Sequence, residues 1–280
     1  MPVDNPSQSL YEKNTTTGKI KARLWEYNAS GRSKISNGDK DTKGEPGVLS
    51  SQSYDGINYM SDASYGRTPG YSKDTLYKEL QTEYINTINS IEKYGGFYIG
   101  RYETGNISSN TPVVRRMNTD IASQTWYTMY TRMKNISTNP NIQTNMIWGS
   151  LYDETLEWII ETGDKARLEI STDSVNWGNY KYTSFKYYNS NGALTDTRNS
   201  TNSTRLATGS TERNSANNIY DLAGNVAECT AEGVNSRSRY LRGGDYVAEG
   251  DSRPARGRDN AVDPISSKNN YGFRAYLYVK

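Results

Sequence analysis

The chain of 280 residues is long enough for one large domain or two small ones, and its formal net charge of +2 argues against a nucleic-acid or anionic-membrane partner. It contains no histidine and a single cysteine, Cys229. This excludes histidine-based catalysis, histidine-ligated zinc or iron, an internal disulfide and any multi-cysteine metal site. No run of about 20 apolar residues could span a bilayer, and no signal peptide is recognisable.

Residues 1–72 form a polar first segment, rich in Ser, Gly, Asn, Asp and Lys. The alternation of Ile20, Ala22 and Leu24 predicts one strand within it. We expect little other regular structure in this N-terminal extension, and one domain over residues 73–280.

An amphipathic helix is predicted from Asp74 onward, and Gly95-Gly96 ends it. Its apolar stripe recurs at three- and four-residue spacing, at Leu76, Leu80, Tyr84, Ile88 and Ile91. A strand is predicted directly after it, at Phe97–Glu103.

Two further helices follow along the chain. One is predicted around Trp126–Met133, from the helical spacing of its large apolar side chains. The other runs from Leu151 to Thr162, with Ser150 as its N-cap and Gly163 as its stop signal.

Short strands and long loops account for the remaining chain. The aromatic-rich stretch Ser174–Tyr188 predicts strand and turn, and residues 189–218 predict a long exposed loop. An apolar strand is expected at Gly272–Val279. Three helices among many short strands indicate an α+β fold.

Tyrosine is unusually frequent, with 24 residues against 5 Trp and 3 Phe, in a chain with only 34% hydrophobic residues. Because a tyrosine combines apolar area with a polar tip, we expect these residues at half-buried and ligand-facing positions more than in a dry core. Surfaces rich in Tyr, Asn, Ser and Gly are typical of loop-based recognition sites. An extracellular domain with many turns would have the same composition.

Four motifs occur in order in the C-terminal two thirds of the chain. They are GGFYIGRYET at 95–104, the helix with Asp153, Glu154, Glu157 and Trp158, NIYDLAGNVAECT at 218–230, and YLRGGDY at 240–246 followed by YGFRAYL at 271–277. This ordered set resembles the formylglycine-generating-enzyme (sulfatase-modifying factor) family. The resemblance implies a variant of the C-type lectin-like fold, with few helices, many short strands and long loops.

The sequence departs from that family at the residues that carry its chemistry. The active enzymes have a copper-binding cysteine pair between the RGG and GFR motifs, whereas Val247–Tyr271 contains no cysteine. Related proteins that oxidise sulfur compounds hold iron through histidines, and this chain has none. Cys229 follows Glu228 where the family has Trp, so we interpret it as a small core residue. We therefore expect neither copper nor iron, and no activity of either type.

The third motif is a candidate calcium site. In calcium-binding members of the family, this motif supplies two side-chain oxygens and two backbone carbonyls, which map here onto Asp221, Gly224, Val226 and Glu228. Hard oxygen ligands of this kind suit Ca²⁺. The alternative is that Asp221 and Glu228 only hydrogen-bond neighbouring backbone.

The segment between the RGG and GFR motifs is the candidate ligand-binding surface. Loops held on an ordered frame are where binding residues concentrate, and Arg, Asn and Ser offer adaptable hydrogen bonds. The candidate residues are Asp245, Tyr246, Glu249, Asp251, Ser252, Arg253, Arg256, Arg258, Asp259, Asn260, Ser266, Ser267, Asn269 and Asn270. The alternative is an ordinary solvated loop face.

The resemblance also includes proteins diversified by retroelements. In such variable proteins the C-terminal variable region lies between RGG-like and GFR-like motifs, and adenine mutagenesis enriches Asn, Tyr, Asp and Ser at the surface. The run Asn269-Asn270-Tyr271 is similar. A genome-wide bias toward Tyr and Asn would produce the same composition.

The sequence thus favours a non-enzymatic binding protein of adhesin or receptor-binding type, displayed on a cell surface or phage particle. Its partner would be a protein or glycan, without nucleic acid and without direct membrane insertion. One alternative is an enzyme of the same family working through carboxylates such as Glu103 and Glu228. Another is a structural component of a pilus or tail, attached through residues 1–72.

Overall fold

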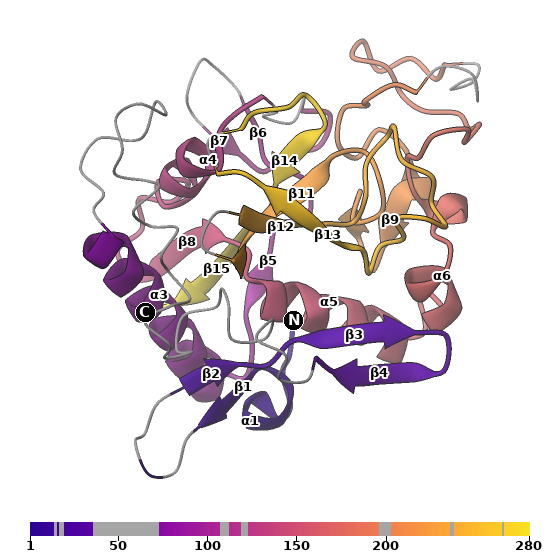
Figure 1. Cartoon of the computed structure of the whole chain (residues 1–280). Coiled ribbons are helices and arrows are strands. Elements are labelled where there is room, and N and C mark those ends of the chain that lie inside the picture. Colours follow the sequence, from indigo (N-terminus) through magenta and orange to yellow (C-terminus); the bar gives the residue numbers. More distant parts are fainter. Residues whose placement is uncertain are drawn as a thin grey trace.

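The computed structural model describes residues 1–13, 16, 20–35, 73–106, 112–118, 123–195, 203–235, 238–264 and 266–280. The described part is a mixed α+β structure with few helices and many short strands (Figure 1). This agrees with the fold class that the sequence predicts.

The N-terminal residues have more regular structure than their composition predicts. Helix α1 (Pro6–Ser9) precedes two antiparallel pairs, which are β1 (Tyr11–Lys13) with β2 (Ile20–Ala22) and β3 (Trp25–Asn28) with β4 (Gly31–Lys34). Val3, Leu10 and Tyr27 are buried in the same hydrophobic cluster as the rest of the chain. These residues therefore contribute to the main core, and a domain boundary at residue 72 stays a prediction.

Helix α3 (Lys73–Tyr94) confirms the first predicted helix. Leu80, Tyr84, Ile88 and Ile91 are all fully buried, as the apolar stripe requires, whereas the Leu76 side chain lies outside the described residues. Gly95 ends the helix with a φ of +77°, a conformation that glycine adopts without steric cost.

The other two predicted helices are also present. They are α4 (Trp126–Met133), capped by the Thr125 hydroxyl, and α5 (Gly149–Glu161). The N-cap of α5 is Trp148, so the prediction of Ser150 was wrong. Ser150 lies within the first turn, where its hydroxyl is buried 3.2 Å from that of Tyr84. The described residues also contain three shorter helical turns: α6 (Arg167–Ser171), η2 (Val175–Trp177) and η3 (Glu212–Asn214).

Two larger sheets are formed by strands between Tyr98 and Val279. One has the order β13-β12-β11-β14, from β11 (Ala227–Asn235), β12 (Ser238–Arg242), β13 (Arg258–Val262) and β14 (Tyr271–Phe273). The other has the order β5-β15-β8, from β5 (Tyr98–Ile99), β8 (Ile142–Met146) and β15 (Ala275–Val279). The predicted strands at 97–103 and 272–279 are thus shorter or divided, because Arg274 interrupts the second between β14 and β15.

Two two-stranded ladders complete the strand inventory of the described residues. They are β6 (Gly105–Asn106) with β7 (Pro112–Val113), and β9 (Ser215–Ala216) with β10 (Ile219–Tyr220). The stretch 174–188 contributes η2 and isolated bridges, so the strand predicted there did not form as a named element.

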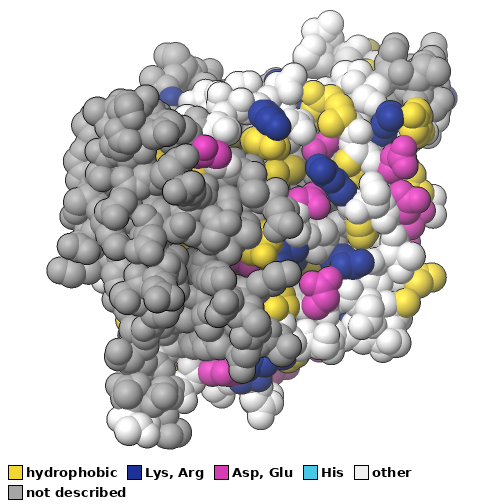
Figure 2. Space-filling view, viewed as in Figure 1, with side chains coloured by type: hydrophobic (Ala, Val, Ile, Leu, Met, Phe, Trp, Pro, Cys, Tyr) yellow, Lys and Arg dark blue, Asp and Glu magenta, His cyan; other side chains and the backbone are white. Residues whose placement is uncertain are grey.

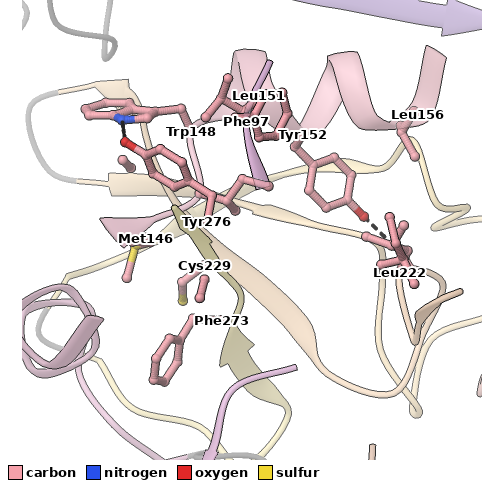
Figure 3. Packing of buried hydrophobic residues seen from close by; sticks show 14 of the residues in the cluster. Phe97, Met146, Trp148, Leu151, Tyr152, Leu156, Leu222, Cys229, Phe273 and Tyr276 are labelled. Atoms are coloured by element: carbon pink, nitrogen blue, oxygen red, sulfur yellow. Dashed lines mark hydrogen bonds between the residues drawn. The ribbon is translucent and has the colours of Figure 1, made fainter. Parts of the chain in front are cut away.

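Tyrosines fill much of the core, in contrast to the expected half-buried positions. Figure 3 shows Trp148 Nε1 donating to the Tyr276 hydroxyl at 3.0 Å and the Tyr152 hydroxyl donating to the Leu222 carbonyl at 2.9 Å. The largest fully buried tyrosines are Tyr27, Tyr84, Tyr127, Tyr130, Tyr152, Tyr180, Tyr220 and Tyr276. Paired hydroxyls remove the cost of burying a polar tip, which explains how a chain poor in Phe and Leu fills its interior.

Among the described helices, none has the length and apolar character needed to cross a membrane.

Candidate functional site

The four sequence motifs meet in space and form a buried polar frame. Glu103 of the first motif is fully buried and accepts from Asn225 Nδ2 at 2.5 Å and from the Val226 N–H at 3.2 Å. The Asn225 side chain in turn accepts from Asn179 and Leu206. Glu103 therefore holds the loop of the third motif in place, and its carboxylate does not face solvent.

A second part of this frame is an ionic cluster shared by helix α5 and the larger sheet. Asp153 accepts from Arg242 Nη2 and from Arg258 Nη2, each at 2.6 Å, and Glu232 pairs with Arg258. The Trp25 N–H also donates to Asp153, at 2.9 Å. The cluster thus joins the β3–β4 hairpin, α5 and strands β11 to β13 through charges with little access to water.

The predicted calcium residues lie close together, but both carboxylates already have partners. Asp221 accepts from the Thr208 hydroxyl at 2.9 Å and from the Gly209 N–H at 2.8 Å. Glu228 accepts from Arg274 Nε at 2.8 Å and Nη2 at 2.5 Å. The Arg274 guanidinium therefore supplies a positive charge beside Glu228, a side-chain partner that neither the calcium prediction nor its backbone alternative included.

Calcium binding through Asp221, Gly224, Val226 and Glu228 stays a prediction. Within the described residues, no group of three acidic, histidine or cysteine side chains has the arrangement of a metal site, and two of the four predicted ligands are backbone carbonyls. Calorimetric titration with Ca²⁺ tests the prediction directly.

The predicted ligand residues separate into exposed and internal groups. The exposed ones are Glu249, Asp251, Ser252, Arg253, Ser267 and Asn269. Those of intermediate exposure are Tyr246, Arg256, Arg258, Asp259, Ser266 and Asn270. Asp245 is buried, and the Asn260 side chain lies outside the described residues.

Asp245 joins the two ends of the segment. Its carboxylate accepts from the Val247 N–H at 2.9 Å, the Ala248 N–H at 3.1 Å and Asn270 Nδ2 at 2.9 Å. Gly244, with a φ of +70°, precedes it, and a Cβ there would lie 2.4 Å from the Arg253 carbonyl. The start of the segment is therefore rigid, and Asp245 positions the loop from inside.

Ser252, Arg256, Arg258 and Asp259 line a cavity of about 500 Å³ against the N-terminal hairpin. Its other wall includes Glu26, Ser33 and Lys34. Arg256 bridges the two walls, since its Nη1 donates to Glu26 Oε1 at 2.8 Å and its backbone N–H donates to the Ile170 carbonyl at 3.1 Å. We name this the hairpin cavity.

The hairpin residues of this cavity were not found from the sequence. Glu26 and Ser33 are ordinary surface residue types, and their position opposite residues 252–259 depends on contacts more than 200 residues apart along the chain. The alternation of Ile20, Ala22 and Leu24 indicated a strand but carried no information about its partner.

The electrostatic character of this surface is mixed. Arg253 lies 3.4 Å from Asp259 and 3.7 Å from Asp245, and its side chain is 44% exposed. Among the coloured side chains in Figure 2, basic and acidic residues lie interspersed. Such a surface suits a ligand with both hydrogen-bond donors and acceptors more than a polyanion.

Cys229 is buried beside Phe273, consistent with its interpretation as a packing residue (Figure 3). Burial, with the nearby charge of Glu228 adding to it, raises the pKa of the thiol to about 12. The thiolate needed for nucleophilic attack or metal binding is therefore scarce at neutral pH.

Comparisons with known proteins give no family assignment. No family model matches the chain, and no curated protein matches it. Among solved structures, Treponema denticola variable protein 1 is similar with a TM-score of 0.40 and 14% sequence identity, over 63% of this chain and 77% of that chain. A likeness at this level establishes neither the fold family nor a function.

Proposed function

We propose that the chain is a non-enzymatic ligand-binding protein of C-type lectin-like fold, which presents residues 246–270 as its recognition surface. The observation that carries the proposal is the contrast between the two parts of this region. Exposed polar side chains such as Glu249, Asp251 and Arg253 project from a backbone that the buried Asp245 fixes at both ends. A rigid frame with adaptable side chains lowers the entropic cost of binding.

The burial of two carboxylates, Glu103 and Glu228, supports a non-enzymatic role. Glu103 and Glu228 were the candidate acid–base residues of the enzymatic alternative. Each is at most 1% exposed, and each is held by strong hydrogen bonds from the frame. A carboxylate that cannot reach a substrate proton is unsuited to acid–base catalysis.

The ligand that we propose is a protein or a glycan on another cell or surface. The mixed charge around Arg253 and the neutral polar Ser252, Ser267 and Asn269 offer hydrogen bonds of both kinds. We also propose that a retroelement diversifies this surface. Diversification would affect the exposed positions only, because substitution of Asp245 or Arg258 would disrupt buried contacts.

Binding is tested with an array of purified surface proteins and glycans, probed with the unaltered chain and with a variant carrying E249A, D251A and R253A. We expect at least one array partner to lose most of its signal with the triple variant. A matched variant with Y182A and K186A, on exposed residues outside the segment, should keep the signal. Equal binding of all three proteins, or no binding at all, would contradict the proposal.

Diversification is tested separately by sequencing the gene from many isolates. Amino-acid substitutions should concentrate at exposed positions between 246 and 270, while Asp245, Arg242 and Arg258 stay unchanged. An even spread of substitutions along the chain would remove this part of the proposal and leave the binding role intact.

A further inference from the structure

A second cavity lies between the N-terminal residues and helix α5. Its volume is about 710 Å³, within the range of about 300–1,000 Å³ that is usual for small-molecule sites. Its lining includes Ser9, Arg23, Trp25, Arg32, Glu154 and Trp158, all within the described residues. We name it the α5 cavity.

The β3–β4 hairpin separates the α5 cavity from the hairpin cavity. In this ladder Glu26 pairs with Ser33 and Tyr27 pairs with Arg32, so the two pairs point to opposite faces. Glu26 and Ser33 line the hairpin cavity, whereas Arg32 lines the α5 cavity. The two cavities are therefore distinct sites, and each is completed by the same hairpin.

Four polar atoms of the α5 cavity are buried and make no well-formed hydrogen bond to the described residues, although the Ser9 hydroxyl interacts with the Glu154 carboxyl. They are Ser9 Oγ, Arg23 Nε, Arg32 Nη1 and Glu154 Oε2. Ser9 is only 8% exposed. Arg32 Nη1 and Glu154 Oε2 are 3.8 Å apart, which is an ion pair but too long for a hydrogen bond. Native proteins leave few such atoms unpaired, so their concentration in one cavity points to a ligand.

The set of unpaired atoms restricts the chemistry of that ligand. Two are guanidinium donors, one is a carboxylate acceptor, and the Ser9 hydroxyl can donate or accept. An inorganic anion would satisfy only the donors, and a cation only the acceptors. A ligand with several hydroxyl groups satisfies both, since each hydroxyl donates one hydrogen bond and accepts others.

The cavity is close to electrically balanced. Arg23 and Arg32 face Glu154, and burial raises the pKa of Glu154 to about 7, against the opposing effects of Arg32 and Ser9. Asp4 and Glu161 stand at exposed positions of the rim. No single charge therefore dominates, which favours a ligand without a large net charge.

Two tryptophans supply the apolar part of the lining. Trp25 is held by its Nε1 donating to the Ser9 carbonyl at 2.8 Å, and the Arg32 guanidinium lies over its ring at 4.4 Å. Trp158 is half-buried and lines the same cavity. Among the described residues, no guanidinium or ammonium group lies over its ring. An aromatic ring beside polar groups suits a ligand that has both apolar C–H faces and hydroxyl edges.

We propose that the α5 cavity is a second binding site, and that it takes a short neutral oligosaccharide. The hydroxyl groups would pair with Arg23, Arg32, Ser9 and Glu154, and a sugar face would pack against Trp158. This site does not use residues 246–270, so it is independent of the recognition surface proposed above.

The test uses ligand-detected NMR with cellotriose, chitotriose and lactose as saccharide probes and the peptide Gly-Asn-Gly as a comparison. We expect saturation transfer to at least one saccharide. Its affinity, followed by the concentration dependence of the saturation-transfer signal, should fall at least about tenfold in W158A, which corresponds to about 1.4 kcal/mol. It should fall likewise in Q8W, where a large side chain at an exposed rim position blocks entry.

Two control variants show whether the saccharide binds in the α5 cavity or elsewhere on the surface. Y98A, on an exposed tyrosine outside the cavity, and K186A, on an exposed lysine outside both the cavity and the recognition surface, should leave saccharide binding unchanged. Because Q8W changes an exposed residue, it tests the cavity even if W158A impairs folding, and thermal melting identifies that case. The proposal is wrong if none of the three saccharides binds, if Q8W binds as well as the unaltered chain, or if only the peptide gives a signal.

Discussion

At the scale of single residues, Glu83 is a buried carboxyl group with a strongly raised pKa. It lies on α3, is 6% exposed, and accepts from the Tyr130 hydroxyl at 3.0 Å, with Lys134 Nζ 3.8 Å away. Burial raises the pKa of Glu83 to about 8, and hydrogen bonds from Tyr130, Tyr276 and Trp148 only partly oppose the shift. Burial also lowers the pKa of Lys134 to about 7. Near neutral pH the folded protein therefore keeps a proton on Glu83 that the unfolded chain, with the ordinary pKa of 4.5, has already released.

This difference predicts a fall in stability with rising pH. Because the pKa of Glu83 in the folded protein lies above its unfolded value of 4.5, protonation of Glu83 stabilises the folded state. This stabilisation is complete below about pH 4.5 and is lost as the pH rises toward 8. E83Q removes the titration, so it should be more stable than the unaltered chain at pH 7, by up to about 3 kcal/mol at 1.36 kcal/mol per pH unit.

Urea unfolding of both proteins at pH 5, 6 and 7 measures this effect. The gap between them should widen over that range, with N89A, at an exposed position of the same helix, as the matched control. A constant gap would show that Glu83 has an ordinary pKa.

Cys229 gives a second prediction at this scale. With burial raising its pKa to about 12, the thiol should not react with iodoacetamide in the folded protein at pH 8 within hours, and should react within minutes in urea. Mass spectrometry of the modified peptide measures both rates. Rapid modification of the folded protein would contradict the packing role of Cys229.

At the scale of elements, Asp153 determines how the N-terminal hairpin, α5 and the larger sheet are joined. Three sequence-distant groups donate to it, from Trp25, Arg242 and Arg258. Arg242 and Asp153 are both fully buried. The net contribution of each buried ion pair to stability is small. Loss of Asp153 would nevertheless be costly, because it would leave buried guanidinium groups without their partner.

Removal of Asp153 should therefore be strongly destabilising. We expect D153A to lower the free energy of unfolding by about 3–5 kcal/mol, the range found for breaking a buried ion pair. E161A, on the exposed end of the same helix, should change it by less than about 0.5 kcal/mol. Chemical denaturation measures both. Equal effects of the two variants would argue against the ionic frame.

At the scale of the whole molecule, the N-terminal residues belong to the same core as the motif-containing part. Val3, Leu10, Tyr11, Ala22 and Tyr27 are at most 5% exposed and pack in the common cluster. The Tyr27 hydroxyl donates to the Asp153 carbonyl at 2.6 Å, and the Tyr84 hydroxyl donates to the Leu10 carbonyl at 2.9 Å. These contacts join residues 1–35 to α3 and α5.

A chain beginning at residue 73 should consequently fail to fold cooperatively. Loss of the N-terminal residues uncovers the apolar sides of α3 and α5, at a cost of about 1.5–3 kcal/mol for each large side chain exposed. Circular dichroism and thermal melting measure the outcome. A cooperative transition within a few degrees of that of the full chain would instead support residues 73–280 as an independent domain.

The sequence by itself determined the three longest described helices, the α+β class and the absence of histidine chemistry. Leu80, Tyr84, Ile88 and Ile91 predicted α3, because a helical repeat is a local pattern. Local spacing was sufficient for each of these inferences. The segment between the RGG and GFR motifs contains exposed polar residues such as Arg253 beside internal ones such as Asp245, and its role in binding stays a prediction.

Only the tertiary structure decided which polar residues are internal and which face solvent. Asp245 and Arg258 have the same residue types as their exposed neighbours Asp251 and Arg253, yet the first pair is held by Asn270, Asp153 and Glu232. Likewise, Glu26 and Arg32 lie on the same hairpin but line two different cavities. The hairpin packs on residues more than 100 positions away in the sequence. A charge can be buried only where folding brings a partner next to it, and a local sequence pattern does not predict which distant residue that partner is.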